Sequence, residues 1–254
     1  ILATFCDRWE SINFIYERNL HWTKVKPSDL AGVNLDKEIF NFSHENVPEQ
    51  VIALNNRLAS PLPGLVAQLK AAPPHRPTSF EMSDLESARQ AAVLWLMYPT
   101  SDGDIEGVLI ERAEYDGVHS RQVGMPGGEM EISDTDYIET ALRECHEELG
   151  IAVQRENVLG ALSPLYIPPS NFYVRPYVAW LPKCPVWSPD EREVSNVLRC
   201  KMSYVSDSET WKSYDIKGVK VPGFLLDSRL VWGATAMMIA ELVECWKLPD
   251  TFAK

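Results

Sequence analysis

The chain has 254 residues, and its proportions of 45% hydrophobic and 24% charged residues exclude collagen-like, coiled-coil and intrinsically disordered proteins. The 36 Asp and Glu residues outnumber the 24 Lys and Arg residues, and the resulting net charge of −12 opposes nonspecific binding to the phosphates of nucleic acids. We therefore expect a globular protein of one large domain, or of one domain with an extension, that does not bind nucleic acid.

The cysteine pattern indicates a reducing compartment. The five cysteines are odd in number, and even the nearest two, Cys184 and Cys200, are too far apart in sequence for a CxxC metal knuckle. No apolar stretch reaches the roughly 20 residues of a membrane-spanning helix, and acidic residues near the start oppose a secretory signal. We expect a cytoplasmic protein with no membrane partner, and targeting to an organelle is left open.

The first third of the chain carries few structural signals. Residues 1–45 show no sustained hydrophobic period, whereas residues 48–58 favour a short helix. The proline-rich passage at 61–77 marks a boundary. We therefore expect an N-terminal extension of unknown role at 1–77, followed by one domain at 78–254.

The second part of the chain predicts alternating strands and helices. The apolar run Ala91–Tyr98, a polar turn and the run Gly107–Arg112 predict a β-hairpin. Helix formers with an acidic first turn, followed by Gly150 as a C-cap, predict a helix over Thr135–Leu149. Three further elements are expected: strands over Asn157–Ile167 and Phe172–Leu181, and a mostly buried helix over Trp232–Trp246.

The predicted helix at 135–149 and the turn before it are strongly acidic. Eight carboxylates lie between residues 127 and 150: Glu129, Glu131, Asp134, Asp136, Glu139, Glu144, Glu147 and Glu148. The last three have the spacing i, i+3 and i+4, so they share one helical face on which like charges repel. Carboxylates in this pattern suit Mg²⁺ or Mn²⁺, which also bind substrate phosphates. The alternative is a solvated acidic face without a ligand.

The segment MPGGEMEISDTDYIETALRECHEELGI resembles the signature of the Nudix hydrolases, a glycine pair followed by REUXEEXGU, where U is aliphatic. Residues 143–151 match the second half of the signature at every fixed position, with Cys145 in an aliphatic slot. The resemblance implies an α/β fold, the Nudix-type α/β/α sandwich with a mixed sheet, here with an N-terminal extension. It also implies a metal-dependent diphosphate hydrolase.

The resemblance assigns roles to residues of the motif. Glu144, Glu147 and Glu148 are the expected catalytic metal ligands for Mg²⁺ or Mn²⁺, and the carbonyl group of Gly128 is a further expected ligand. Arg143 is the expected ion-pair partner that orients these carboxylates. Cys145 is expected to fill the core, and His119 and His146 are expected to be surface or structural residues rather than a catalytic acid or base.

Two further features resemble the coenzyme A diphosphatase branch of the family. Asp134 stands one position before the usual Glu of the signature, and residues 108–128 fit the spacing of that branch's accessory motif without a gap. Arg112 matches this motif and Arg121 departs from it, and both guanidinium groups suit substrate phosphates. The whole resemblance runs from about residue 91 to residue 245.

These patterns predict hydrolysis of the diphosphate bond of coenzyme A or a related nucleoside diphosphate derivative, a small-molecule substrate. A second hypothesis keeps the chemistry and changes the substrate to ADP-ribose, a dinucleotide or a nucleoside triphosphate. A third is a non-catalytic Nudix-fold binding module. Glu148, Glu191 and Glu193 are all candidates for the general base, residues 1–60 are expected to be dispensable for catalysis, and the oligomeric state is left open.

Overall fold

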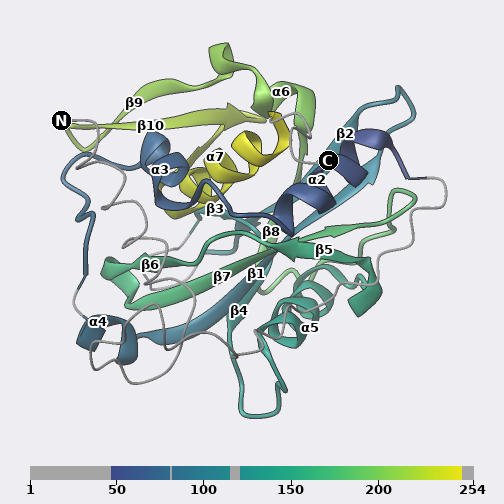
Figure 1. The fold of residues 1–254 in the computed structure, drawn as a ribbon, viewed down its shortest axis with the longest axis horizontal. Helices are drawn as coiled ribbons and strands as arrows, with labels where there is room; N and C mark the ends of the chain where they lie inside the picture. The colour runs from purple at the N-terminus through teal and green to yellow at the C-terminus, as the bar shows by residue number, and fades with distance from the viewer. Residues whose placement is uncertain (1–46, 81, 115–120, 248–254) are drawn as a thin grey trace, which may run out of the picture. The chain divides into compact units, whose positions relative to one another are not determined.

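The computed structural model describes residues 47–80, 82–114 and 121–247 (Figure 1). Residues 1–46 lie outside the described residues, and they include the whole segment 1–45 that shows no sustained hydrophobic period. His119 also lies outside the described residues. Within the described parts, no helix is long and apolar enough to span a lipid bilayer.

A mixed sheet of eight strands forms the centre of the described fold, with β3, β2, β1, β7 and β5 as neighbours in that order. Strand β1 (Arg89–Pro99) is paired in parallel with β7 (Phe172–Trp180) over most of its length. The remaining strands are β2 (Ile105–Arg112), β3 (Val123–Gly124), β4 (Gly127–Glu129), β5 (Val158–Ala161), β6 (Leu165–Ile167) and β8 (Val194–Lys201). The mixed sheet confirms the predicted fold class.

One edge of β1 pairs with two different strands along its length. Residues 91–93 pair with β4, whereas residues 97–99 pair with β2 in the hairpin that the sequence predicted. Because β7 occupies the other edge throughout, β2 and β4 must diverge along β1. This divergence opens the sheet at its middle, and the candidate site described below lies there.

Helices cover both faces of the sheet (Figure 1). Helix α5 (Tyr137–Leu149) packs through Ile138, Cys145 and Leu149 on the face that presents Leu94 and Leu96, so Cys145 fills the core as expected. Helix α7 (Gly233–Lys247) packs on the opposite face, together with α2 (Glu49–Leu58) and α3 (Gly64–Gln68). The layers are therefore α/β/α.

The boundaries of α5 follow from its capping residues. Asp136 accepts a hydrogen bond from the Glu139 amide at 2.9 Å and so caps the N-terminus, which places the first helical residue at Tyr137 rather than at Thr135. Gly150 ends the helix in the left-handed conformation, with φ of 68°. The C-cap confirms the expected end of the helix.

A second sheet of three antiparallel strands was not predicted from the sequence. It contains β9 (Lys212–Ile216), β10 (Val219–Leu226) and β11 (Arg229–Trp232). Left-handed residues form both turns, Lys217 and Gly218 in the first and Asp227 and Ser228 in the second. Both are two-residue hairpin turns. Sequence patterns can indicate such turns, but polar residues in the flanking strands obscured the pattern. Short helices α4 (Met82–Glu86) and α6 (Met202–Ser206) complete the described elements, with short 3₁₀ turns.

The two helices that precede the expected boundary at residue 77 share a core with the rest of the fold. Helix α2 buries Val51, Leu54 and Leu58 in the cluster that contains α7. Removal of residues 1–60 would therefore remove core side chains, while the expectation that this segment is dispensable for catalysis stays a prediction. The division at residue 77 stays a proposal.

A buried carboxyl group ties α3 to α7. Glu241 of α7 is fully buried and accepts hydrogen bonds from the Gly64 amide at 3.0 Å, the Gln68 side chain at 2.8 Å and the Ser163 amide at 3.2 Å. Burial raises the pKa of Glu241, while these donors oppose the rise. One side chain thus fixes α3 and the loop after β5 against α7.

We expect Leu54→Ala to destabilise the protein by about 2–5 kcal/mol, because Leu54 is 1% exposed and its truncation leaves a cavity in the core. Urea unfolding of the full chain measures the effect. Asn56→Ala is the matched control, since Asn56 is exposed on the same helix and should change stability by less than about 0.5 kcal/mol. Equal stability of the two variants would show that α2 does not contribute to the core.

Candidate active site

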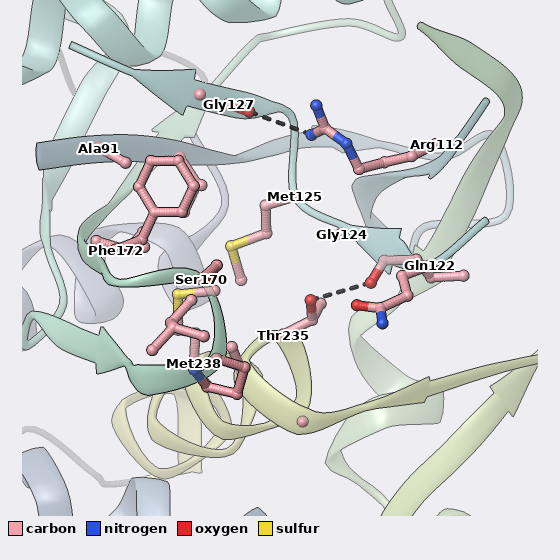
Figure 2. A pocket seen from close by; sticks show the side chains of 18 of the residues that line it. Ala91, Arg112, Gln122, Gly124, Met125, Gly127, Ser170, Phe172, Thr235 and Met238 are labelled. Atoms are coloured by element: carbon pink, nitrogen blue, oxygen red, sulfur yellow. Dashed lines mark hydrogen bonds between the residues drawn. The ribbon is translucent and has the colours of Figure 1, made fainter. Parts of the chain in front are cut away.

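A cavity of about 980 Å³ opens where β2 and β4 diverge from β1 (Figure 2). Its polar end contains Arg112, Glu144 and Glu193, whereas Met125, Phe172, Met237 and Met238 line an apolar part. A large concave site with a few convergent polar groups is the usual form of a small-molecule site. The sequence located the polar end but not the apolar walls.

The glycine pair forms the turn beside the polar end. Gly127 has a positive φ of 151°, and a Cβ atom there would lie 2.4 Å from the carbonyl oxygen of Ala92. A Cβ atom on Gly128 would lie 2.5 Å from Oε1 of Glu144. Glycine is therefore required at position 127, where β4 lies against the backbone of β1, whereas a side chain at position 128 would displace the carboxylate of Glu144.

Glu148 is buried beneath this turn. Its side chain is 0% exposed, accepts a hydrogen bond from the Gly127 amide at 2.8 Å and lies 3.4 Å from Nη1 of Arg112. The pKa of Glu148 is raised to about 8, mainly by burial and to a smaller extent by the charges of Glu144 and Glu193, while Arg112 and the Gly127 amide oppose the rise. The geometry brings Glu148, Arg112 and the glycine turn together, as the sequence predicted for a single site.

Glu144 and Glu147 differ in their surroundings. Glu144 lines the cavity with its side chain 14% exposed, and burial raises its pKa while Arg143 opposes the rise. Glu147 is 52% exposed and does not line the cavity. Nη1 of Arg143 contacts both carboxylates, at 2.9 Å and 2.8 Å respectively. The structure therefore places two of the three predicted metal-binding carboxylates, Glu144 and Glu148, in or beneath the cavity wall.

Arg143 joins α5 to the loop that precedes it. Its guanidinium group makes a two-point contact with Asp134, at 2.9 Å and 3.0 Å, and donates to the carbonyl oxygen of Glu129 at 3.1 Å. Asp134 also accepts hydrogen bonds from the Glu131 amide and from Thr140, and the bond from Arg143 is the main reason that its pKa falls to about 2. Asp134 is thus an anchor for Arg143, while Asp136 is the helix cap.

The two arginines predicted to bind substrate lie in different places. Arg112 lines the cavity, and its Nη1 atom lies 3.5 Å from the carbonyl oxygen of Gly127 (Figure 2). Arg121 is 68% exposed, lies 3.5 Å from Glu114 and is not among the residues that line the cavity. The gap-free spacing of the accessory motif therefore does not bring Arg121 to the same site as Arg112.

A loop after β7 adds an acidic group that the helical motif does not contain. The Ser188 amide donates to the carbonyl oxygen of Leu149 at 2.8 Å, and the Asp190 amide donates to that of Glu148 at 3.1 Å. The Ala113 amide donates to the carbonyl oxygen of Glu193 at 2.7 Å, which fixes the other end of the loop. Glu193 and Arg192 line the cavity, and Glu191 does not. Of the two loop acids that the sequence offered as a base, Glu193 is therefore the one at the site.

The start of α7 and the residue before it form the wall opposite the glycine turn. Trp232, Ala234, Thr235 and Met238 line the cavity there, although the sequence predicted only helix packing for Trp232. Thr235 donates a hydrogen bond to the carbonyl oxygen of Val123 at 3.0 Å (Figure 2). This wall could not be recognised from sequence, because only the tertiary fold brings residues 232–238 to the motif.

The carboxylate oxygens at the polar end of the cavity are suitable ligands for a hard cation, but their present arrangement does not surround one. Within the described residues, no group of three or more His, Cys, Asp and Glu side chains has the geometry to hold a metal ion. The charges of Glu144 and Glu193 nevertheless contribute to the raised pKa of Glu148, while the contacts of Arg112 with Glu148 and of Arg143 with Glu144 offset part of this negative charge. Carboxylate oxygens of this kind are ligands for Mg²⁺ and Mn²⁺.

Comparison with known proteins gives the family. Residues 88–206 match the NUDIX domain. The chain is 33% identical over 141 residues to a protein named uncharacterized Nudix hydrolase NudL from Yersinia enterocolitica, which covers 54% of this chain and 72% of the relative. It is 32% identical over 142 residues to NudL of Yersinia pestis, which covers 54% and 70%.

A crystal structure of a MutT/nudix family protein from Enterococcus faecalis superimposes with a TM-score of 0.46 at 13% identity, covering 67% of this chain and 63% of that chain. The domain match spans the glycine turn, the acidic helix and the loop that carries Glu193. The chain belongs to the Nudix hydrolase family.

Proposed function

We propose that this protein hydrolyses the diphosphate bond of coenzyme A or a related nucleoside diphosphate derivative with the help of a divalent cation. One observation carries the proposal: Glu144, Glu148, Arg112 and Glu193 converge on the polar end of one large cavity. That end combines negative groups for a cation with a positive group for a phosphate. The apolar remainder of the cavity suits a substrate that extends well beyond its diphosphate.

Nudix hydrolases generally use divalent metal ions, and a bound Mg²⁺ or Mn²⁺ ion would neutralise the diphosphate and lower the pKa of an attacking water. Glu144 and Glu148 would hold the cation, with the carbonyl group of Gly128 as a further ligand. Glu147 would join them only by leaving Arg143, which it contacts now. Arg143 itself orients the helix and its carboxylates through Asp134.

Arg112 would bind an oxygen of the diphosphate. Its side chain is 32% exposed and contacts Glu148 and the Gly127 carbonyl at 3.4 Å and 3.5 Å, which are long distances for hydrogen bonds. The guanidinium group therefore retains donors for a phosphate, whose oxygens match its planar geometry.

Glu193 is the general base in this proposal. Its carboxyl group is close enough to Glu144 and Glu148 to raise the pKa of both, yet its side chain is exposed at the cavity wall, where a water molecule can reach it. Glu148, the other candidate, is fully buried and already accepts a hydrogen bond from Gly127. A base must lie within hydrogen-bond reach of the water that it deprotonates, and this requirement favours Glu193.

We expect Glu144→Gln and Glu148→Gln each to lower kcat/KM by more than the roughly 10- to 100-fold that loss of an outer ligand contact causes. The change removes the charge that binds the cation and keeps the size of the side chain. Assays with Mg²⁺ and with Mn²⁺, and melting curves with and without each ion, measure it. Glu156→Gln is the control, since Glu156 is exposed and remote from the cavity lining. Parental activity and unchanged stabilisation by metal in both variants would show that these carboxylates bind no cation.

We expect Glu193→Gln to lower kcat by about 100- to 10,000-fold with little change in KM, because a general base acts on the transition state. Glu191→Gln provides the control from the same loop, because Glu191 does not line the cavity. A larger effect in the Glu191 variant would place the base elsewhere in the loop.

Substrate profiling tests the specificity. We expect a higher kcat/KM for coenzyme A than for ADP-ribose, because the apolar wall of Met125, Met237 and Met238 can bury the pantetheine arm. A preference of tenfold or more for ADP-ribose or a nucleoside triphosphate would support the second substrate hypothesis. No turnover of any diphosphate with either metal would support a binding module.

A further inference from the structure

The proline-rich passage before the domain forms a turn at the edge of the cavity. The Arg76 amide donates to the carbonyl oxygen of Pro73 at 3.2 Å, Pro74 follows Pro73, and His75 has a left-handed φ of 65°. Proline second and a left-handed residue third are typical of a type II turn. Pro73 and Arg76 both line the cavity, although they lie outside the matched NUDIX residues 88–206.

The turn directs Arg76 toward the start of β6 and β7. Its guanidinium group donates to the carbonyl oxygen of Tyr166 and lies 5.7 Å from the centre of the Phe80 ring. Proline restricts the backbone at its own position and at the residue before it, so the turn that carries Arg76 is stiff. The side chain of Arg76 is held against β6 by its bond to Tyr166.

Arg89 approaches the same part of the cavity from β1. It is paired in register with Phe172, and its guanidinium group lies 4.1 Å from the centre of the Phe172 ring. Its ion pair with Glu129 joins side chains that are 52% and 44% exposed. Ion pairs between exposed side chains contribute little, so a phosphate dianion can compete with Glu129 for this arginine.

The charges along the cavity are unusual for so acidic a chain. Among the described residues, the cationic side chains that line it are all arginines: Arg76, Arg89, Arg112 and Arg192. Arg112 contacts Glu148 of the acidic helix, and Arg192 adjoins Glu193, whereas Arg76 and Arg89 lie around Phe172 and the start of β7. The hydroxyl group of Ser170, also in the lining there, is buried and has no hydrogen-bond partner among the described residues.

We propose that Arg76, Arg89 and Ser170 form a second anion subsite, which binds a phosphate monoester of the substrate at a distance from the diphosphate. The inference rests on the proposed function, because it places the diphosphate at Arg112 and the acidic helix. The substrate class is then a nucleoside diphosphate derivative whose ribose carries an additional phosphate. The 3′-phosphate of coenzyme A and the 2′-phosphate of an NADP-type dinucleotide share this chemistry.

Paired substrates test the subsite in the full chain. We expect kcat/KM for coenzyme A to exceed that for 3′-dephospho-coenzyme A by about 10- to 100-fold, the loss that follows removal of a charged hydrogen-bond partner. The ratio should fall toward 1 in Arg76→Gln and in Arg89→Gln. Arg199→Gln should keep the parental ratio, because Arg199 is exposed on β8 and does not line the cavity. NADPH and NADH differ by a 2′-phosphate, so their kcat/KM ratio makes the same comparison for that position. The two substrate pairs together show which phosphate the subsite binds.

Binding of products separates this inference from the proposed function. We expect the parental protein to bind adenosine 3′,5′-bisphosphate at least tenfold more tightly than AMP in calorimetry, and the two arginine variants to lose this preference. Equal kcat/KM within each substrate pair, with diphosphate hydrolysis intact, would overturn the subsite alone. Failure to hydrolyse either form of coenzyme A would overturn the proposed substrate, and equal affinity for the two products would then overturn the subsite as well.

Discussion

The buried carboxyl group of Glu148 imposes the main constraint on the candidate active site. A carboxyl group without contact to water is strongly unfavourable unless hydrogen bonds and charge compensate it. Here the Gly127 amide of β4 and the guanidinium group of Arg112 of β2 do so, and both strands must therefore meet the last turn of α5. The glycine turn follows from the same requirement, since a side chain at Gly127 would collide with β1 and move the amide away from Glu148.

Arg143 applies a complementary constraint at the opposite side of the turn. It neutralises part of the acidic surface and links α5 to Asp134 and to the backbone of Glu129. Asp134 is therefore explained by its contact with Arg143, whatever the substrate of the enzyme. The acidic helix is thus held both by the buried Glu148 and by the half-buried arginine, and Glu144 is oriented between them.

Local signals predicted the elements that carry their own periodicity or caps. The hairpin of β1 and β2, the helix α5 with Asp136 and Gly150 at its ends, and the buried helix α7 were all predicted close to their observed bounds. The short strands β3 and β4 escaped prediction because they contain mostly glycine and exist only through pairing with β1 and β2. The same limit applies to the site: the spacing in the motif indicated Glu144 and Glu148, whereas the positions of Glu193, Met238 and Arg76 depend on long-range folding.

The contact of Glu241 with α3 links the two walls of the cavity that lie outside the matched domain. The turn that carries Arg76 continues from α3, and the opposite cavity wall is the first half of α7, so one buried carboxyl group holds both walls in a common frame. Neither wall belongs to the segment that defines the family. Loss of the Glu241 carboxylate would therefore release both walls at once, and the cavity would change shape although no residue of the acidic helix had been altered.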